Sequence, residues 1–479
     1  MKSLKINAFY SLINQFILVI IPFITFPYVS RILGARNYGL FTYANSIVNI
    51  FAVFGGLGVA SYATREISIK KSENKNLNQL FQELFFIQLI LTSFIFFIYL
   101  VIISSVSDFR SDFIVFFLIG MTLLTNLFSY QWFFVGIENF KLIAIRDGCI
   151  KVLFMVAIFV FVREDTDLII YILITLLSFL ATAVLNGFSL FKNIKFTKTN
   201  LNFQLHFKPV SIALAISFIS TVTVQLNPIV LRNIASDEIL GIYNVGIRII
   251  TMVVTIIVNA STIMLPRLSS LSGTKNKESQ SQLMYDVFHL LGIISIPGSI
   301  GLFIYSEWII LTLFGEEFMA SIPISQITAF ALLPMALIPL LYNFLYSIGK
   351  ENLSIYNMVI SLGFNIILII LGGGTYSAIG FAYVFMATEI IKLVIYFLIL
   401  KRLKIKIKLM SMNYFLYLGA AIVAIALPQF LFTINGLFIN GLMMILSCFF
   451  YFFILYLFKE EMTRRALSNL RIIVDQRRK

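Results

Sequence analysis

Long apolar segments alternate with short polar stretches along the whole chain. Each apolar segment holds roughly 20 residues, which is enough for a helix to cross the hydrocarbon core of a bilayer. The pattern therefore predicts an all-α integral membrane protein with about fourteen transmembrane helices. The predicted helices cover residues 6–30, 40–63, 81–104, 113–135, 142–162, 168–190, 209–231, 240–265, 283–305, 322–346, 353–371, 376–400, 412–432 and 436–458.

Composition agrees with a membrane environment. Hydrophobic residues make up 59% of the 479 positions, and charged residues only 12%. A soluble domain is about one-quarter charged, so this chain has too few polar side chains to cover its surface in water. The two cysteines, Cys149 and Cys448, lie within predicted helices and match no metal or disulfide spacing.

The basic residues fall mainly on one side of this topology. With the N-terminus in the cytoplasm, 28 of the 36 Lys and Arg lie in cytoplasmic segments and five lie in outer loops. Because Lys and Arg are retained on the cytoplasmic side, both termini are predicted to be cytoplasmic. The net charge is +14, and the cytoplasmic Lys and Arg are spread over eight separate segments. This spread argues against a nucleic-acid surface and for contact with anionic membrane lipids.

The loops limit the kind of function. No predicted outer loop is longer than about 16 residues, and no cytoplasmic loop could form a domain. Binding must therefore take place within the membrane, which favours a transporter over an enzyme.

A phrase near the start of the chain recurs about 200 residues later. PYVSRILGARNYGLFTYA begins at Pro27, and PIVLRNIASDEILGIYNVG begins at Pro228. Six predicted helices separate the start of one copy from the start of the other, so a parallel repeat is expected. The predicted organisation is an N-lobe at 1–195 with six helices, a C-lobe at 196–408 with six, two further helices at 409–458 and a basic cytoplasmic tail at 459–479. Landmarks that keep their spacing in both copies are Arg31 and Arg232, Gly39 and Gly241, Arg65 and Arg267, and Glu83 and Asp286.

Polar side chains line single faces of several predicted helices, at steps of three or four residues. Such stripes either bridge packed helices or line a hydrated cavity. One stripe, in the eleventh helix, consists of Ser354, Asn357, Ser361 and Asn365. The candidates for a polar cavity lining are Asn14, Asn45, Asn49, Asn244, Thr251 and Asn259.

Arg248 is the deepest basic candidate, roughly 12 Å inside its helix by helix rise. A charge at such depth costs about 2–4 kcal/mol unless it meets water or a partner. No acid lies three or four positions away, so we expect Arg248 to face a hydrated cavity that receives an anion. Arg31 and Arg232 lie at outer helix ends, where each is either a snorkelling side chain or helix C-cap, or part of a shared gate or rim. Arg146 and Lys151 are either plain cytoplasmic-side charges or a cationic vestibule.

Three charged residues are candidates for ion coupling. Glu389 lies three positions before Lys392, and Asp286 lies three positions before His289. Each pair is either a local structural contact or a site that carries H+ or Na+. His206 and His289 are too isolated to hold a metal, so no cofactor is expected.

The first copy of the phrase resembles a known family. The residues that carry the likeness follow a Phe-rich first helix; they are Pro27, Ser30, Arg31, Leu33, Gly34, Ala35, Tyr38, Gly39 and Leu40. They resemble Wzx-type polysaccharide flippases of the multidrug/oligosaccharidyl-lipid/polysaccharide (MOP) exporter superfamily. Lipid II flippases of that superfamily carry basic residues in helix one, whereas residues 6–30 contain none.

The resemblance implies a MATE-like fold and a role in lipopolysaccharide or capsule biosynthesis. The implied activity is the flipping of undecaprenyl-diphosphate-linked O-antigen or capsule repeat units from the cytoplasmic to the periplasmic leaflet of the inner membrane. Alternating access around a cationic cavity is the implied mechanism, and a polysaccharide polymerase and a chain-length regulator are the implied protein partners. Two alternatives stay open: a cation-coupled small-molecule exporter of the same superfamily, and a membrane glycosyltransferase or polymerase.

Overall fold

The computed structural model describes residues 2–73, 76–192, 194–196, 201–262, 277–373, 377–405, 413–431, 437–458 and 460. Helices account for nearly all of these residues, and the described part of the chain contains no strand. Most of the predicted basic tail at 459–479, and Arg267, lie outside the described residues. The chain forms two compact units, Met1–Gly241 and Ile242–Lys479.

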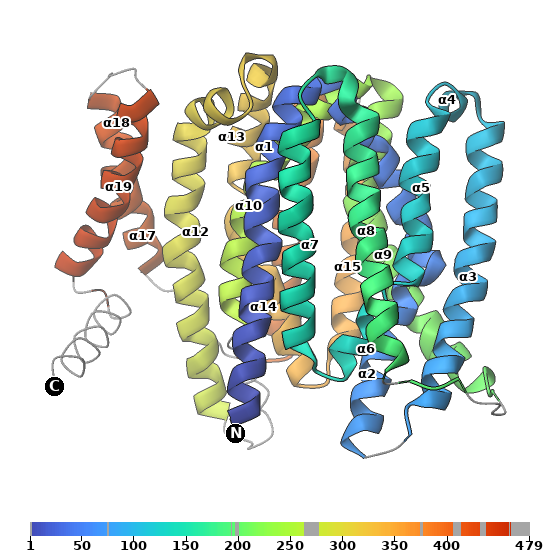
Figure 1. Cartoon of the computed structure of the whole chain (residues 1–479). Coiled ribbons are helices and arrows are strands. Elements are labelled where there is room, and N and C mark those ends of the chain that lie inside the picture. The colour runs from blue at the N-terminus through green and yellow to red at the C-terminus, as the bar shows by residue number, and fades with distance from the viewer. Residues whose placement is uncertain are drawn as a thin grey trace, which may run out of the picture. The chain divides into compact units, whose positions relative to one another are not determined.

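The first unit is built from nine helices that are joined mostly by short turns (Figure 1). They are α1 (Lys2–Ala52), α2 (Gly58–Ser72), α3 (Asn78–Ser105), α4 (Ser107–Arg110), α5 (Phe113–Leu127), α6 (Gln131–Gly136), α7 (Phe140–Phe161), α8 (Leu168–Phe191) and α9 (Gln204–Ile234). A π-helical turn, η1 (Val53–Leu57), joins α1 to α2, and a 3-10 turn, η2 (Asp165–Asp167), precedes α8.

The second unit begins within α10 (Asp237–Thr262), at Ile242, and its described residues are also mostly helical. Its further elements are α12 (Lys277–Leu313), η3 (Glu316–Ser321), α13 (Ile322–Ala329), α14 (Leu332–Ser347), α15 (Glu351–Leu368), η4 (Ile369–Gly373), α16 (Ser377–Arg402), α17 (Asn413–Ala421), η5 (Ile422–Ala426), α18 (Leu427–Leu431) and α19 (Leu437–Leu457).

Within the described residues, ten helices are long and apolar enough to cross a membrane, or eleven if a pair bent by 49° forms one span. The chain is therefore a multi-pass membrane protein, as its composition predicts. The exact count of fourteen stays a prediction. One reason for the lower count is α1, which joins the first predicted helix to the first half of the second in one element.

The bend within α1 depends on Gly34. Its backbone has φ 73° and ψ 170°, a conformation that residues with a Cβ rarely adopt. The two halves of α1 meet at this residue, and their junction is tied to the α7–α8 turn. Asn37 donates a hydrogen bond to the carbonyl of Asp165 at 2.8 Å, and the Tyr28 hydroxyl donates to the carbonyl of Val162 at 2.8 Å.

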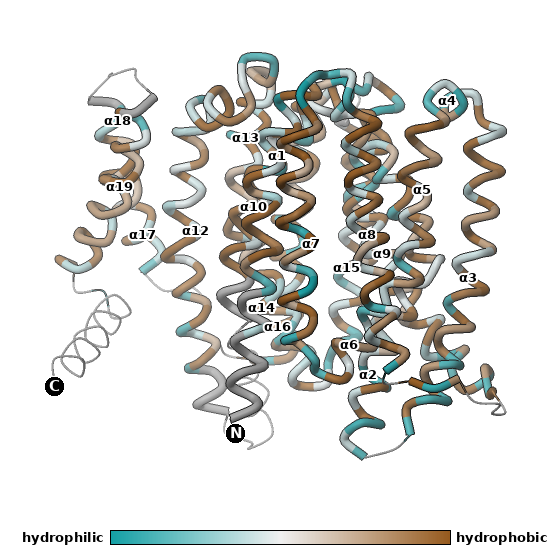
Figure 2. The backbone as a smooth tube through the Cα atoms, in the orientation of Figure 1, coloured by the Kyte–Doolittle hydropathy of each residue, from teal (hydrophilic) through white to brown (hydrophobic). Residues whose placement is uncertain are grey.

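The surface of the first unit suits lipid. Phe97 on α3 and Phe188 on α8 are each 65% exposed. The middle parts of these two helices are hydrophobic, whereas α2 becomes hydrophilic toward its end (Figure 2). Inside, Phe81, Trp132 and Phe133 pack into an aromatic cluster. Large apolar side chains thus face outward as well as inward, as hydrocarbon solvent allows.

The two copies of the repeated phrase pack directly against each other within the first unit. A Cβ on Gly39 would lie 1.7 Å from the carbonyl oxygen of Asp237, and a Cβ on Gly241 would lie 1.9 Å from that of Ala35. Each glycine thus faces the backbone four residues before the other glycine. Such a reciprocal exchange is the contact pattern of two elements related by a two-fold axis.

The first unit also includes α9, which the predicted lobes assign to the second half of the chain. Contacts of α9 with α1, α2 and η1 account for this assignment. The lobe boundary between residues 195 and 196 stays a prediction.

Candidate functional site

A polar cavity lies between the second half of α1 and helices α5 and α8. It has a volume of about 100 Å³. Asn45 and Asn49, two residues predicted to line a cavity, both line this one. They lie four positions apart, so one face of α1 presents both. Thr122, Asn126 and Thr175 complete its polar lining.

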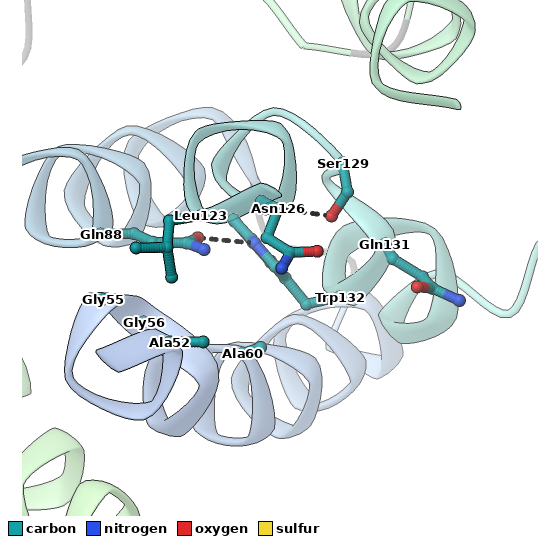
Figure 3. Close-up of a pocket in the computed structure, with 10 residues that line it drawn as sticks. All are labelled: Ala52, Gly55, Gly56, Ala60, Gln88, Leu123, Asn126, Ser129, Gln131 and Trp132. Atoms are coloured by element: carbon teal, nitrogen blue, oxygen red, sulfur yellow. Dashed lines mark hydrogen bonds between the residues drawn. The ribbon is translucent and has the colours of Figure 1, made fainter. Parts of the chain in front are cut away.

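A second cavity of about 120 Å³ lies beside the π-helical turn η1 (Figure 3). Its polar lining consists of Gln88, Asn126, Ser129, Gln131 and Trp132. Small residues of α1, η1 and α2 form the opposite side: Ala52, Gly55, Gly56 and Ala60.

The wall of the second cavity is held by two hydrogen bonds between helices. The indole Nε1 of Trp132 donates to the side-chain carbonyl of Gln88 at 3.0 Å. The Thr92 hydroxyl donates to the carbonyl of Gly55. Gly56 has φ 130°, and a Cβ there would lie 2.6 Å from Cγ of Gln88. A glycine at this position therefore lets Gln88 approach the turn.

The two cavities are neighbours, because Ala52 and Asn126 line both. Neither lining contains Lys, Arg, Asp or Glu. We call the combined lining the amide track and define it by its polar residues Asn45, Asn49, Gln88, Thr122, Asn126, Ser129, Gln131, Trp132 and Thr175. These two cavities are thus polar but uncharged.

The predicted vestibule residue Arg146 lies outside both cavities, at the start of α7. Its side chain is buried, and its Nε donates to the carboxylate of Asp147 at 2.9 Å. Phe134 covers the guanidinium with 5.4 Å between the charge and the ring centroid. Nη1 has no hydrogen-bond partner among the described residues. Lys151 follows about one turn later and is partly buried.

Arg232 belongs to a charged cluster at the end of α9. It contacts Asp237 at 3.1 Å and Asp108 at 3.6 Å, and it lies over the ring of Tyr43. Arg31, its equivalent in the first copy, is exposed on α1. The two arginines therefore have different surroundings despite their equivalent positions.

In the second unit, Arg248 is exposed on α10, and Asn244 and Thr251 beside it are partly exposed. The opposite face of α10, which includes Ile249 and Ile250, is buried. The predicted polar face is thus the accessible one. Asn259 also belongs to α10, but its side chain lies outside the described part of the chain, whereas that of Asn14 on α1 is partly buried.

The polar stripe of α15 bridges helices rather than lining a cavity. Asn357 donates to the carbonyl of Lys392 at 3.0 Å, and Asn365 donates to the hydroxyl of Thr388 at 3.0 Å. All four residues of the stripe are buried. Of the two interpretations that the sequence leaves open, the structure selects helix–helix contact.

The candidate coupling residues form local contacts. Lys392 Nζ lies 2.6 Å from the carboxylate of Glu389. Asp286 accepts a hydrogen bond from Gln282 at 2.8 Å. His289 lies instead beside Tyr417, with 3.1 Å between Nδ1 and the hydroxyl.

One buried charged cluster does not appear among the predicted site residues. His206 of α9 lies 3.0 Å from the carboxylate of Glu83 through Nε2 and 2.9 Å from the Tyr62 hydroxyl through Nδ1. Glu83 also accepts from the backbone of Asn202 at 2.9 Å. The cluster ties the start of α9 to α2 and α3. Sequence signals for it were present, because Glu83 is a landmark of the repeat and His206 is one of two histidines.

The site residues that sequence reasoning missed are Gln88, Gln131, Trp132 and Thr175, and the polar series Thr122, Asn126 and Ser129 at the end of α5. That series repeats at steps of four and three residues, so helical spacing was an available signal for it. For Gln88, the signal was an isolated amide within an apolar helix. Such a residue is costly in hydrocarbon unless it meets a polar partner.

Solved structures of transporters share this fold. A lipid II flippase, MurJ, in its inward closed conformation matches with a TM-score of 0.70 and 18% identity, over 96% of this chain and 99% of that one. A multidrug resistance MATE family transporter in an inward-facing conformation matches with a TM-score of 0.59 and 14% identity, over 83% and 95%. With its many spanning helices, the protein is a multi-pass membrane protein with the same fold as these transporters.

Sequence comparison gives the family. The model of the polysaccharide biosynthesis protein family matches residues 4–272, and the MatE model matches residues 211–371. The chain belongs to the polysaccharide biosynthesis protein family. A candidate O-antigen transporter of Escherichia coli (strain K12) is 25% identical over 170 residues. That stretch covers 35% of this chain and 40% of the relative.

Proposed function

We propose that the protein flips undecaprenyl-diphosphate-linked oligosaccharide repeat units from the cytoplasmic to the periplasmic leaflet of the bacterial inner membrane. The observation that carries this proposal is the amide track, a pair of polar cavities inside an otherwise lipid-adapted bundle. The family match over residues 4–272 and the likeness to an O-antigen transporter candidate support a glycan-bearing cargo.

The chemistry of such a cargo explains why a protein is needed. A diphosphate carries negative charge and sugars carry many hydroxyl groups, so neither enters hydrocarbon without a large free-energy cost. Amide and hydroxyl side chains replace the hydrogen bonds that the sugars lose with water. Arginine provides bidentate contacts for phosphate oxygens. In this proposal Arg248 contacts the diphosphate, and Arg31, Arg232, Arg146 and Lys151 supply a positive potential along its path.

The proposed architecture has fourteen helices, with lobes at 1–195 and 196–408 and both termini in the cytoplasm. Alternating access between the lobes moves the glycan, while the polyprenyl chain stays in lipid. Movement of H+ or Na+ at Glu389, Lys392 or Asp286 supplies the driving force. A polysaccharide polymerase and a chain-length regulator act on the flipped product.

A deletion strain tests the flippase assignment. We expect loss of surface polysaccharide and accumulation of the lipid-linked repeat unit in the cytoplasmic leaflet. Wild-type protein should restore the polysaccharide, whereas Arg248→Ala should reach the membrane without restoring it. Arg248→Lys should restore part of it, because the charge stays while bidentate contact is lost. Normal surface polysaccharide in the deletion strain would refute the assignment.

A small-molecule exporter is a second candidate, favoured by the MatE match over residues 211–371. It predicts that the deletion strain becomes sensitive to organic cations while its surface polysaccharide stays normal.

A further inference from the structure

We propose that the amide track is a binding subsite for the neutral sugar residues of the cargo, separate from any group that binds the diphosphate. This inference rests on the proposed function and adds that different residues bind the sugars and the diphosphate. The amide track would recognise the glycan, and cationic residues outside the track would recognise the phosphate groups.

The absence of charge in the track is the first reason. No Lys or Arg lines either cavity, so neither offers the charge-assisted bonds that hold a diphosphate. No Asp or Glu lines them either, which argues against an organic cation as the occupant. A neutral ligand with many hydroxyl groups needs both donors and acceptors, and a side-chain amide provides both.

Unused amides are the second reason. The side chains of Asn49, Asn126 and Gln131 are exposed, and none makes a hydrogen bond within the described part of the chain. An amide that is left without a partner in an apolar environment costs about 1–3 kcal/mol. Three such groups within a membrane-spanning unit are satisfied when water or a hydroxyl-bearing ligand fills the cavities.

The indole of Trp132 places a fluorescent reporter in the wall of the second cavity. Its hydrogen bond to Gln88 at 3.0 Å fixes the ring there, beside Asn126 (Figure 3). The ring is 4% exposed and stacks on Phe81, so it belongs to the wall and adjoins the occupant through the polar groups beside it.

The cavities also have room for a ligand group. A single water needs roughly 10–15 Å³ of such space. The volumes of about 100 and 120 Å³ are several times larger. Small residues, Ala52, Gly55, Gly56 and Ala60, form one side of the larger space.

The protein contains only two tryptophans, Trp132 and Trp308, which permits a direct test. The full chain carrying Trp308→Phe is placed in phosphatidylethanolamine/phosphatidylglycerol vesicles, where Trp132 is the sole indole. One probe is a polyprenyl diphosphate that bears a neutral disaccharide, and the other is the same polyprenyl diphosphate without sugar. We expect Trp132 emission to change with the first probe and not with the second.

Asn126→Leu, in the same background, removes the amide shared by both cavities. We expect about a tenfold weaker affinity for the sugar-bearing probe, which corresponds to the loss of one or two hydrogen bonds. The affinity for the bare diphosphate should not change. Asn126→Gln should restore much of the binding. Gln326→Leu is the matched control, because it removes an amide outside both cavities and should change neither affinity.

Two outcomes would overturn the subsite. One is an equal emission change with both probes, which would place the diphosphate or the tail near Trp132. The other is normal transport of the sugar-bearing probe by Asn126→Leu with no emission change. The proposed function fails in a different way, since the unmodified chain would then transport neither probe.

Discussion

The guanidinium of Arg232 lies over the aromatic ring of Tyr43, with 4.7 Å between its central carbon and the ring centroid. Tyr43 belongs to the first copy of the repeated phrase and Arg232 to the second. Asp237 approaches the same guanidinium at 3.1 Å. The contact therefore joins both copies through one cation, beside the paired glycines Gly39 and Gly241.

Arg232→Ala should destabilise this junction. A desolvated cation–π contact contributes about 1–2 kcal/mol, and removal of the cation also leaves the carboxylate of Asp237 without this partner. We expect a lower thermal midpoint in detergent, measured by intrinsic fluorescence. Asp108→Asn should have little effect, because the Asp108 side chain is 60% exposed and lies 3.6 Å away. An equal decrease of the thermal midpoint in both variants would contradict the view that Tyr43 and Asp237 are the main partners of Arg232.

Gly39→Ala should force apart the two copies of the repeated segment. Its Cβ would lie 1.7 Å from a backbone oxygen, which cannot rotate away as a side chain can. Overpacking of this kind costs about 1–3 kcal/mol. We expect a reduced yield of folded protein on size-exclusion chromatography and a lower thermal midpoint. Gly363→Ala on α15 is the control, because nothing lies within 4 Å of its Cβ. A Gly39→Ala variant as stable as this control would refute the close contact.

Glu83 and His206 should behave as one coupled unit. Removal of one partner from this buried pair costs about 1–3 kcal/mol, because the other polar group stays behind without its hydrogen bond. We expect Glu83→Leu and His206→Leu each to lower the free energy of unfolding by such an amount. The double variant should lose much less than the sum, and a double-mutant cycle measures the difference. Additive losses would show that the two side chains stabilise the fold independently.

Variants of the Glu389–Lys392 pair can distinguish a role in ion coupling from a role in stabilising the fold. Lys392→Met alone leaves a partly buried carboxylate without its cation, so we expect a loss of stability. Glu389→Gln combined with Lys392→Met removes both charges and should recover most of it. If Glu389 carries H+ or Na+, the double variant should be folded yet show no transport driven by an ion gradient. Gradient-driven transport at the wild-type rate would exclude a coupling role for the pair.

Much of the architecture could be predicted from local properties of the chain. Hydrocarbon selects apolar segments of one length, so composition and periodicity are sufficient to predict a helical multi-pass protein. The predicted ends of many helices agree with the structure to within a few residues, as for 142–162 and α7. The sequence predicted a connection between helices ending at residue 30 and beginning at residue 40. In the structure only Gly34 leaves the helical conformation there, and the chain stays helical on both sides.

The role of each polar stripe required the tertiary structure. Asn45 and Asn49 on α1, and Asn357 and Asn365 on α15, look alike in sequence, since each pair repeats at helical spacing. Tertiary packing places the first pair beside a cavity and brings Thr388 and the backbone of α16 against the second. The same chemical groups thus bind a neighbouring helix in one case and face open space in the other.

The sequence by itself determined the membrane class, the family and the repeated phrase, because these depend on residue types and their spacing along one chain. Only the tertiary structure decided that Gly39 meets the backbone before Gly241 and that Gln88, Asn126 and Trp132 surround one cavity. Those relationships join helices that are far apart in the chain. No local pattern records them, since they depend on which faces pack and on the space that remains between them.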